Sequence, residues 1–310
     1  MRKRRSRRFA IQTAVSAFAG IAASGTSAIF DSMRRMTLGF STYGMKGMPL
    51  EQAIEAIAEV GFESIEICVR PEWGSAPSDM NSDRRAAICK QLTNRSLSLT
   101  ALMEHLPPAA AKVQHEQHLE RLKGVYELAC DLGASRPPIV QTVLGDGEWE
   151  KQKNLFRDRV ADWVQIGEKH HVITCIKPHR GGAMSQPSEA IWLIKQLDST
   201  PWLRIVYDYS HLIYRDISLT ESLREALPYL AHVAVKDAVM NKQEVSFLLP
   251  GEAGTIDFQT MFTMLQANEY QGDVSCEVSG MVSNKPGYDP IAAAKTCFQN
   301  LDFMFRTIVG

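Results

Sequence analysis

Short apolar runs alternate with amphipathic stretches of helical length from Met36 to the end of the chain. Runs rich in β-branched residues predict buried strands, and the amphipathic stretches predict helices that cover them. We expect strands at 36–42, 64–69, 97–103, 137–143, 172–177, 204–208, 231–236 and 273–277. We expect one helix to begin near Pro49 and stop before Gly61, and others at 82–95, 113–132, 154–169, 188–197, 220–230, 257–268 and 290–308.

This alternation favours parallel strands that are joined by helical crossovers. Eight such units follow one another with no linker between them, so the sequence predicts a single (β/α)8 TIM barrel over residues 36–308. The competing fold is an open doubly wound sheet, which would need a glycine-rich phosphate loop after the first strand. Gly39, Gly44 and Gly47 lack the GxGxxG spacing, and no helix is predicted directly after them.

The first thirty residues differ from the rest of the chain. A basic start, an Ala-rich apolar run and the small residues Thr26-Ser27-Ala28 are typical of a signal peptide. The tract Ser6-Arg7-Arg8-Phe9 resembles a twin-arginine signal. We therefore predict a cleavable twin-arginine-type signal segment at residues 1–30 and export to the periplasm, or a cytoplasmic location if the signal is not used. The run is too short and too polar for stable membrane insertion.

Charge and cysteine content narrow the function classes. Removal of the first 28 residues would leave 28 basic against 35 acidic residues, and no stripe of Lys and Arg follows. An acidic barrel of this kind argues against a nucleic-acid partner. The six cysteines contain no CxxC pair and lie mostly in apolar segments, which favours buried thiols over a disulfide framework or a cysteine-ligated metal.

Polar residues follow the predicted strands where those strands end. The carboxyl ends of barrel strands meet at one face, where TIM barrels place their chemistry. The stretch VITCIKPHRGG, residues 172–182, delivers Lys177, His179 and Arg180 to that face. The other polar residues at strand ends are Thr42, Tyr43, Glu66, Arg70, Glu104, His105, Gln141, Asp208, His211, Lys236, Asp237 and Glu277.

Four motifs carry a family resemblance. They are Asp208 with His211 three residues later, the run HVAVKDA ending at Lys236-Asp237, the segment PGEAGTIDF at 250–258, and CEVSG around Glu277. Together they resemble the xylose isomerase-like TIM barrels, a superfamily of sugar phosphate isomerases and epimerases and of nucleases of the endonuclease IV type. The resemblance covers most of residues 36–306.

The resemblance implies a divalent ion, Mn, Mg, Co or Zn, held by a Glu after strand five, an Asp after strand six, a His in strand seven and a Glu after strand eight. In the epimerases the two Glu residues also act as acid and base. By position, the implied metal ligands here are Asp208, Glu277 and His211. The fifth-strand Glu aligns with Lys177, and the seventh-strand His aligns with Ala234.

These two departures weaken the metal hypothesis. A protonated ammonium group offers no lone pair and is repelled by a cation. We therefore expect no cofactor, unless His179, His211 or His232 completes the site or Lys177 is held neutral. In the alternative that we favour, Lys177 takes the place of the ion between Asp208 and Glu277. It would then either neutralise an inactive site or act as a proton carrier opposite Glu277.

The sequence thus predicts a sugar or sugar phosphate isomerase or epimerase-like protein that transfers a proton next to a carbonyl of a carbohydrate. Its expected catalytic residues are Lys177, Glu277 and Asp208. Its expected substrate-binding residues are His179, Arg180, His211, Lys236, Glu66 and His105. The alternatives are a non-catalytic barrel that binds carbohydrates or partners and, less favoured, an endonuclease IV-like hydrolase. Whether the chain forms a homo-oligomer stays open.

Overall fold

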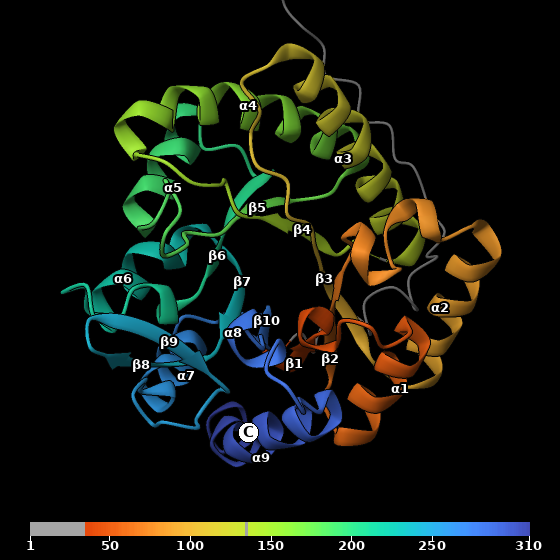
Figure 1. Ribbon diagram of the computed structural model, residues 1–310, viewed down its shortest axis with the longest axis vertical. Helices are drawn as coiled ribbons and strands as arrows, with labels where there is room; N and C mark the ends of the chain where they lie inside the picture. Colours follow the sequence, from red (N-terminus) through yellow and green to blue (C-terminus); the bar gives the residue numbers. More distant parts are fainter. Residues whose placement is uncertain (1–34, 134–135) are drawn as a thin grey trace, which may run out of the picture. The chain divides into compact units, whose positions relative to one another are not determined.

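The eight barrel strands are all parallel and close on themselves (Figure 1). The computed structural model describes residues 35–133 and 136–310, so the predicted signal segment lies outside the described residues. The barrel order is β1-β10-β7-β6-β5-β4-β3-β2, and this closed ring rules out the open doubly wound sheet. The strands are β1 Thr37–Ser41, β2 Ser64–Cys68, β3 Ser98–Met103, β4 Ile139–Thr142, β5 Thr174–Ile176, β6 Leu203–Tyr207, β7 Leu230–Val235 and β10 Asp273–Cys276.

Helices surround the barrel in Figure 1 and follow the strands in sequence. They are α1 Leu50–Val60, α2 Ser82–Asn94, α3 Lys112–Leu132, α4 Trp149–His170, α5 Pro187–Gln196, α6 Leu219–Ala226, α7 Phe258–Ala267, α8 Gly280–Ser283 and α9 Pro290–Val309. Each predicted strand and helix overlaps an observed one. The predicted helix 220–230 ends early as an α-helix, because Pro228 cannot donate the next backbone hydrogen bond and the chain tightens into a 3-10 turn at Leu227–Tyr229.

Two apolar clusters hold the barrel together. The larger one combines strand residues such as Phe40 with helix residues such as Ile54 and Phe305. The smaller one consists of Ala101, Ile139, Cys175, Val206 and Ala234, which come from β3 to β7 in turn. Side chains alternate along a strand, so these residues share the inner face with the polar residues at the strand ends. The smaller cluster therefore forms an apolar layer beneath the site.

A β-hairpin that the sequence did not predict follows β7. Its strands are β8 Asp237–Asn241 and β9 Glu244–Leu248, which pair antiparallel. Both turn residues, Lys242 and Gln243, have positive φ, which is the geometry of a tight hairpin turn that Asn-Gly or Asp-Gly normally signals. Neither dipeptide is present here, so the turn gave no signal in the sequence.

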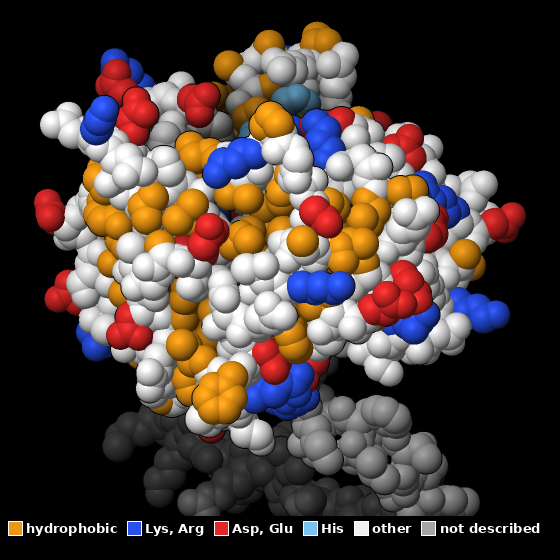
Figure 2. Space-filling view, turned by 60° about the horizontal axis from the view of Figure 1, so that its bottom comes forward, with side chains coloured by type: hydrophobic (Ala, Val, Ile, Leu, Met, Phe, Trp, Pro, Cys, Tyr) orange, Lys and Arg blue, Asp and Glu red, His pale blue; other side chains and the backbone are white. Residues whose placement is uncertain are grey.

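The cysteines are free thiols, as predicted from the sequence, and the surface carries charges of both signs. All six cysteines carry free thiols, and Cys68, Cys175, Cys276 and Cys297 are buried. On the face shown in Figure 2, acidic and basic side chains are intermingled among hydrophobic ones. In residues 35–133 and 136–310, no helix combines the length and the apolar character that a membrane crossing requires.

Candidate active site

Four charged side chains meet at the carboxyl ends of adjacent strands. Lys177, Asp208, Lys236 and Glu277 each directly follow the last residue of β5, β6, β7 and β10. The backbone N–H groups of Lys177 and Glu277 still donate to strand carbonyls, those of Thr142 and Val235, at 3.0 Å each. The sheet therefore fixes where these side chains start. We call these four residues the charge quartet.

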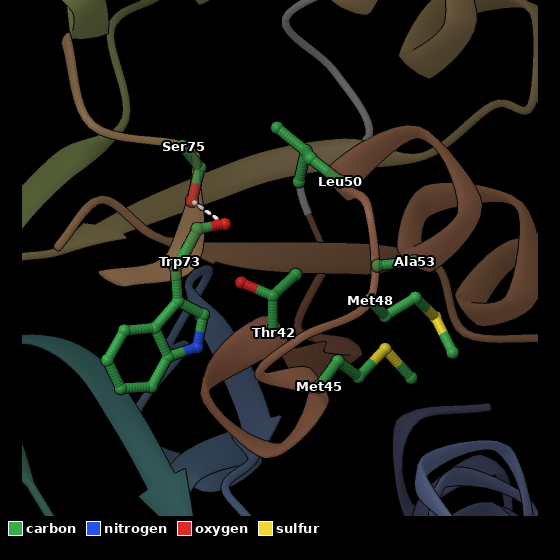
Figure 3. A pocket seen from close by; sticks show the side chains of 7 residues that line it. All are labelled: Thr42, Met45, Met48, Leu50, Ala53, Trp73 and Ser75. Carbon is green, nitrogen blue, oxygen red and sulfur yellow. Dashed lines mark hydrogen bonds between the residues drawn. The ribbon is translucent and has the colours of Figure 1, made fainter. Parts of the chain in front are cut away.

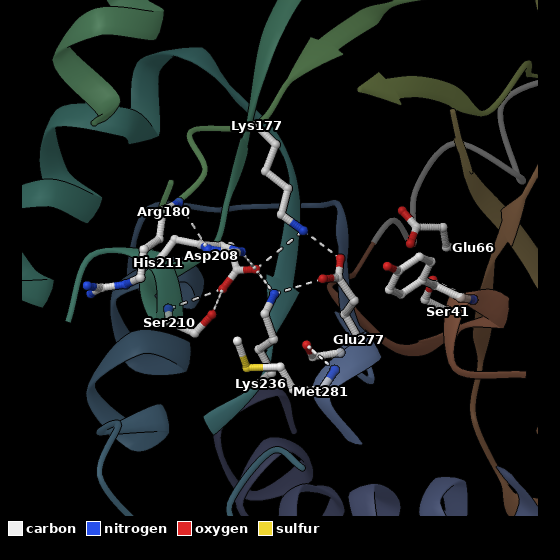
Figure 4. A network of polar contacts seen from close by, with 12 residues as sticks. Ser41, Glu66, Lys177, Arg180, Asp208, Ser210, His211, Lys236, Glu277 and Met281 are labelled. Carbon is white, nitrogen blue, oxygen red and sulfur yellow. Dashed lines mark hydrogen bonds and ion pairs between the residues drawn. The ribbon is translucent and has the colours of Figure 1, made fainter. Parts of the chain in front are cut away.

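The charge quartet is a closed network of ion pairs (Figure 4). Nζ of Lys177 lies 2.5 Å from Oε2 of Glu277 and 3.3 Å from Oδ2 of Asp208. Nζ of Lys236 donates to Oδ2 of Asp208 and lies 2.7 Å from Oε1 of Glu277. Each ammonium thus contacts both carboxylates, and no side chain of the four is more than 8% exposed. Two positive and two negative charges balance one another.

This pairing fixes the resting protonation states. Burial by itself lowers the pKa of Lys177, but the charges of Glu277 and Asp208 outweigh it and raise that pKa. Burial raises the pKa of Glu277 and of Asp208, but the two lysines lower both values to about 2. Near neutral pH the site therefore holds an ammonium acid directly beside a carboxylate base.

The Asp208-to-His211 spacing produces a one-turn helix. Oδ1 of Asp208 accepts hydrogen bonds from the backbone N–H of Ser210 at 3.1 Å and from its hydroxyl at 2.6 Å, which caps the 3-10 turn Tyr209–His211. This turn brings Nε2 of His211 back to 3.4 Å from Oδ2 of Asp208. The backbone N–H of Arg180 donates to Nδ1 of His211 at 3.2 Å.

His211 is neutral because of these surroundings. Its burial, followed by the charge of Lys236, lowers its pKa well below the usual value. His179 packs against it with ring centroids 4.0 Å apart, and burial followed by the charge of Lys177 lowers the pKa of His179 to about 4. Phe247 of the β8–β9 hairpin closes the other side, 5.0 Å from the His211 ring and 5.2 Å from Nζ of Lys236.

A second polar group involves Glu66, outside the ion pairs of the charge quartet. Nε2 of Gln141 donates to Oε2 of Glu66, and Nε2 of His232 lies 3.4 Å from the same oxygen. Burial lowers the pKa of His232, but Glu66 outweighs it and raises that pKa. Oε1 of Glu66 is buried without a hydrogen-bond partner. Glu66 therefore keeps one acceptor free, although Figure 4 shows it beyond Glu277 as seen from Lys177.

The rim contains His105 and an aromatic pair. His105 is exposed, and its backbone N–H donates a hydrogen bond to Oε1 of Glu104 at 2.8 Å. The rings of Tyr43 and Trp73 stack at 5.4 Å. The indole N–H of Trp73 is buried without a partner and points toward Thr42 in a small pocket (Figure 3). The pocket is lined by Thr42, Met45, Met48, Leu50, Ala53, Trp73 and Ser75.

Comparisons with known proteins identify the family to which this barrel belongs. The xylose isomerase-like TIM barrel family model matches residues 54–300. The chain belongs to this family. An inosose dehydratase of Clostridium perfringens is 23% identical over 242 residues, which cover 72% of this chain and 80% of that protein.

Solved structures share the fold. The IolI protein, in a structure with a bound zinc atom, matches with a TM-score of 0.72 and 18% identity, over 88% of this chain and 99% of that one. An L-ribulose 3-epimerase matches with a TM-score of 0.69 and 17% identity, over 88% of this chain and 95% of that one. At these identities the two structures show the shared fold.

A divalent ion would need donors that the charge quartet already uses. One oxygen or nitrogen each of Asp208, His211 and Glu277 lies within 4.8 Å of the others, a spacing suited to a metal. However, both oxygens of Glu277 accept from ammonium groups, and Oδ2 of Asp208 does so as well. Because Nδ1 of His211 accepts a hydrogen bond, its proton is on Nε2, which leaves no lone pair facing the carboxylates. In this arrangement the donor set does not fit a metal.

Ala234, which aligns with the family's seventh-strand histidine, also does not fit a metal site. Ala234 is 1% exposed and packs with Cys175 and Val206 in the smaller apolar cluster. Its side chain offers no donor atom for a metal. His232, on the same face of β7, contacts Glu66 instead of the charge quartet.

The structure brings some predicted site residues together and separates others. Lys177, Asp208, Lys236, Glu277, His211 and His179 form one connected group, whereas Glu66 lies beside it and His105 lies on the rim. Lys236, which is predicted to bind substrate, contacts both carboxylates of the charge quartet in this structure. Sequence reasoning missed Phe247. The alternation of polar and apolar residues in Glu244–Leu248 is the signal in the sequence that could have indicated this strand.

Proposed function

We propose that the protein catalyses proton transfer at a carbon next to a carbonyl group of a carbohydrate, with Lys177 and Glu277 as the acid and base. Membership of a family whose relatives modify sugars supports the substrate class. The chemistry is inferred from the charge quartet.

One observation carries this proposal: each member of the Lys177–Glu277 pair has a second partner. If the pair opens, Glu277 keeps Lys236 at 2.7 Å and Lys177 keeps Asp208 at 3.3 Å. Neither charge is then left buried and unpaired, which would be costly. A substrate can therefore enter between the acid and the base without collapse of the site.

The reaction follows from the protonation states. The Lys177 ammonium donates a hydrogen bond to the substrate carbonyl oxygen, which makes the neighbouring C–H more acidic. The Glu277 carboxylate accepts that proton, and Lys177 transfers its own proton to the oxygen, which gives a neutral enediol. Glu277 then gives its proton to a carbon of the enediol, while a hydroxyl group of the enediol returns a proton to the neutral Lys177. Protonation of the neighbouring carbon gives an isomer, and protonation of the first carbon on its opposite face gives an epimer. Once Lys177 turns to the substrate, Glu277 loses one positive neighbour, so its pKa rises and it becomes a stronger base.

Neighbouring residues would hold the substrate. His179 and His211 are neutral and can exchange hydrogen bonds with hydroxyl groups, and Arg180 adds a guanidinium. Glu66 has a free acceptor at Oε1. Phe247 covers His211 and limits the access of water.

Dehydration is a second candidate outcome of the same first step. The similarity to an inosose dehydratase over 72% of the chain favours it. Loss of a hydroxyl group from the carbon next to the deprotonated one would give an unsaturated product and water. Both outcomes need the same Glu277 base, so a single assay separates them.

Solvent exchange tests the proposal. The protein is incubated in D2O with ketoses, aldoses and keto-inositols, and mass spectrometry reads carbon-bound deuterium and loss of water. We expect deuterium in at least one ligand. Lys177→Met and Glu277→Gln should each lower the exchange rate by about 10²- to 10⁴-fold. Lys177→Arg keeps the charge but removes a tunable proton donor, so it should be comparably slow while remaining folded.

The matched control is Lys195→Met, which removes an exposed lysine of α5 and should leave exchange unchanged. A sugar that binds and never exchanges a carbon-bound proton would overturn the proposal in favour of a non-catalytic carbohydrate-binding barrel.

Metal analysis tests the role of Lys177 separately. Protein prepared without chelators should contain no stoichiometric divalent ion. The double variant Lys177→Glu with Ala234→His restores the family's ligand types, so it should gain a metal. A stoichiometric ion in the native protein would contradict the ammonium-for-metal hypothesis.

A further inference from the structure

Two arginines at the mouth of the barrel have no acidic partner. Arg180 lies in the loop after β5, and Arg215 lies in the loop after β6. In the described part of the chain, neither guanidinium forms an ion pair with a carboxylate, and both donate to neutral oxygens. The carboxylates of the charge quartet are already paired with its two lysines, so they do not pair with these arginines.

The two arginines hold their loops together. Nη2 of Arg180 donates to the carbonyl of Ile213 in the neighbouring loop. Arg215 donates in return to Ser185, at 3.0 Å to its carbonyl and 3.1 Å to its hydroxyl. These reciprocal contacts fix both side chains at one junction while leaving some of their N–H donors without an acceptor.

The junction is electrostatically incomplete. Nε of Arg180 is buried and has no hydrogen-bond partner. Burial lowers the pKa of Arg180, and the charge of Arg215 lowers it further. Two guanidinium groups therefore repel each other, and neither forms an ion pair with a carboxylate in the described residues. His179 beside them is neutral near pH 7 and adds no charge.

The backbone beside this junction is open to solvent. Gly181 directly follows Arg180, is exposed and has positive φ. A Cβ built at Gly181 would meet no atom within 4 Å. The Arg180 backbone is also hydrogen-bonded to His211, which ties the junction to the charge quartet.

We propose that Arg180 and Arg215 bind the anionic group of the substrate, which makes the substrate a sugar phosphate or a sugar acid. The inference rests on the proposed function, because it names the substrate class for the same site. Planar guanidinium groups bind phosphate and carboxylate oxygens through paired, charge-assisted hydrogen bonds. An oxyanion would accept from the remaining N–H groups of the two guanidiniums and would offset the repulsion between the two arginines.

Calorimetry with inorganic phosphate tests this without any need for catalysis. The native protein should bind phosphate, and Arg180→Gln and Arg215→Gln should each weaken binding by roughly 10-fold or more, as expected for a lost charged hydrogen bond. Arg215→Lys is the second variant, for use if Arg215→Gln fails to fold. It keeps the positive charge, so it should retain part of the phosphate affinity. Arg159→Gln is the matched control, because Arg159 also donates to two backbone carbonyls, but from α4.

A second set of titrations identifies the anion and uses matched ligands: a neutral sugar, its phosphate ester and its sugar acid. Tighter binding of one anionic form, lost in Arg215→Gln, supports the proposal and shows which oxyanion is bound. Equal affinity for all three ligands, or phosphate binding that is absent or unchanged in the arginine variants, overturns it. Anion binding without deuterium exchange would refute the proposed catalysis alone, and exchange of a neutral sugar without anion binding would refute the arginine site alone.

Discussion

At the residue scale, the two lysines have complementary partners. Lys177 lies closer to Glu277 than to Asp208, while Lys236 contacts Asp208 and Glu277 at hydrogen-bond distance. A single lysine would leave one carboxylate under-compensated in a site with almost no solvent. The second lysine allows Lys177 to leave Glu277 during a reaction while the carboxylate stays ionised.

The buried charges predict a loss of stability in acid. His179 has a lowered pKa, so the unfolded chain takes up its proton below pH 6.5 and the folded protein takes it up near pH 4. Asp208 and Glu277 act in the same direction, between their ordinary values and about 2. At His179, Asp208 and Glu277 the unfolded state binds more protons, so these groups make stability fall as pH falls. His232, whose pKa is raised, acts in the opposite direction. Urea denaturation should show a loss on the order of 2 kcal/mol between pH 6.5 and pH 4.

His179→Gln is the control for this prediction, since it removes one of these groups and should reduce the slope between pH 6.5 and pH 4, while His211, whose pKa is also lowered, keeps contributing. A native midpoint that stays constant over that interval would contradict the assignment of a neutral His179.

At the scale of elements, Asp237 anchors the β8–β9 hairpin. Its buried carboxylate accepts from the backbone N–H groups of Ala238 and Ala253 at 3.0 Å, from that of Gly254 at 2.8 Å, and from the hydroxyl of Thr255. These bonds join the start of the hairpin to the loop before α7. Because Asp237 directly follows Lys236, the same bonds support one member of the charge quartet.

Asp237→Ala should destabilise the protein by about 3 kcal/mol, because four hydrogen bonds to a buried, charged acceptor are lost. Asp257→Ala is the matched control, since Asp257 caps the exposed start of α7 and should cost only about 1 kcal/mol. Chemical denaturation measures both. Equal effects would show that the hairpin does not depend on the buried carboxylate.

At the scale of the whole barrel, closure depends on close contact at β1. Gly39 pairs with Ser64 of β2 and Ser275 of β10. Asp273 is buried and accepts hydrogen bonds from Thr37 at 3.2 Å, from Thr100 at 3.0 Å and from Ser64. This polar cluster joins β1, β2, β3 and β10, where the two ends of the barrel sequence meet.

Gly39→Ala should weaken that closure. The added Cβ would lie 2.5 Å from Oγ of Ser64 and 2.7 Å from Oδ1 of Asp273, so the cluster would have to shift. We expect a cost of about 1–3 kcal/mol in chemical denaturation. Gly124→Ala in α3 is the control, because its nearest neighbour would be 3.5 Å away and alanine favours helix, so stability should hold or rise. If Gly39→Ala left the free energy of unfolding unchanged, this would contradict the close contact of β1 with Ser64 and Asp273.

The sequence by itself determined the barrel and the chain positions of its site. Strand and helix periodicities are local, and a closed ring places all strand ends on one face. Strand-end position, together with the motifs that resemble the family, therefore singled out Lys177, Asp208, His211 and Glu277. The β8–β9 hairpin could not be predicted in this way, because two non-glycine residues adopt positive φ at its turn under tertiary constraint.

Only the tertiary structure decided how those residues share their charges. That Lys236 contacts both carboxylates, that Glu66 joins Gln141 and His232, and that Arg215 comes to Arg180 all depend on distances between residues far apart in sequence. Electrostatic energy depends on those distances and on burial, neither of which is present in a linear pattern.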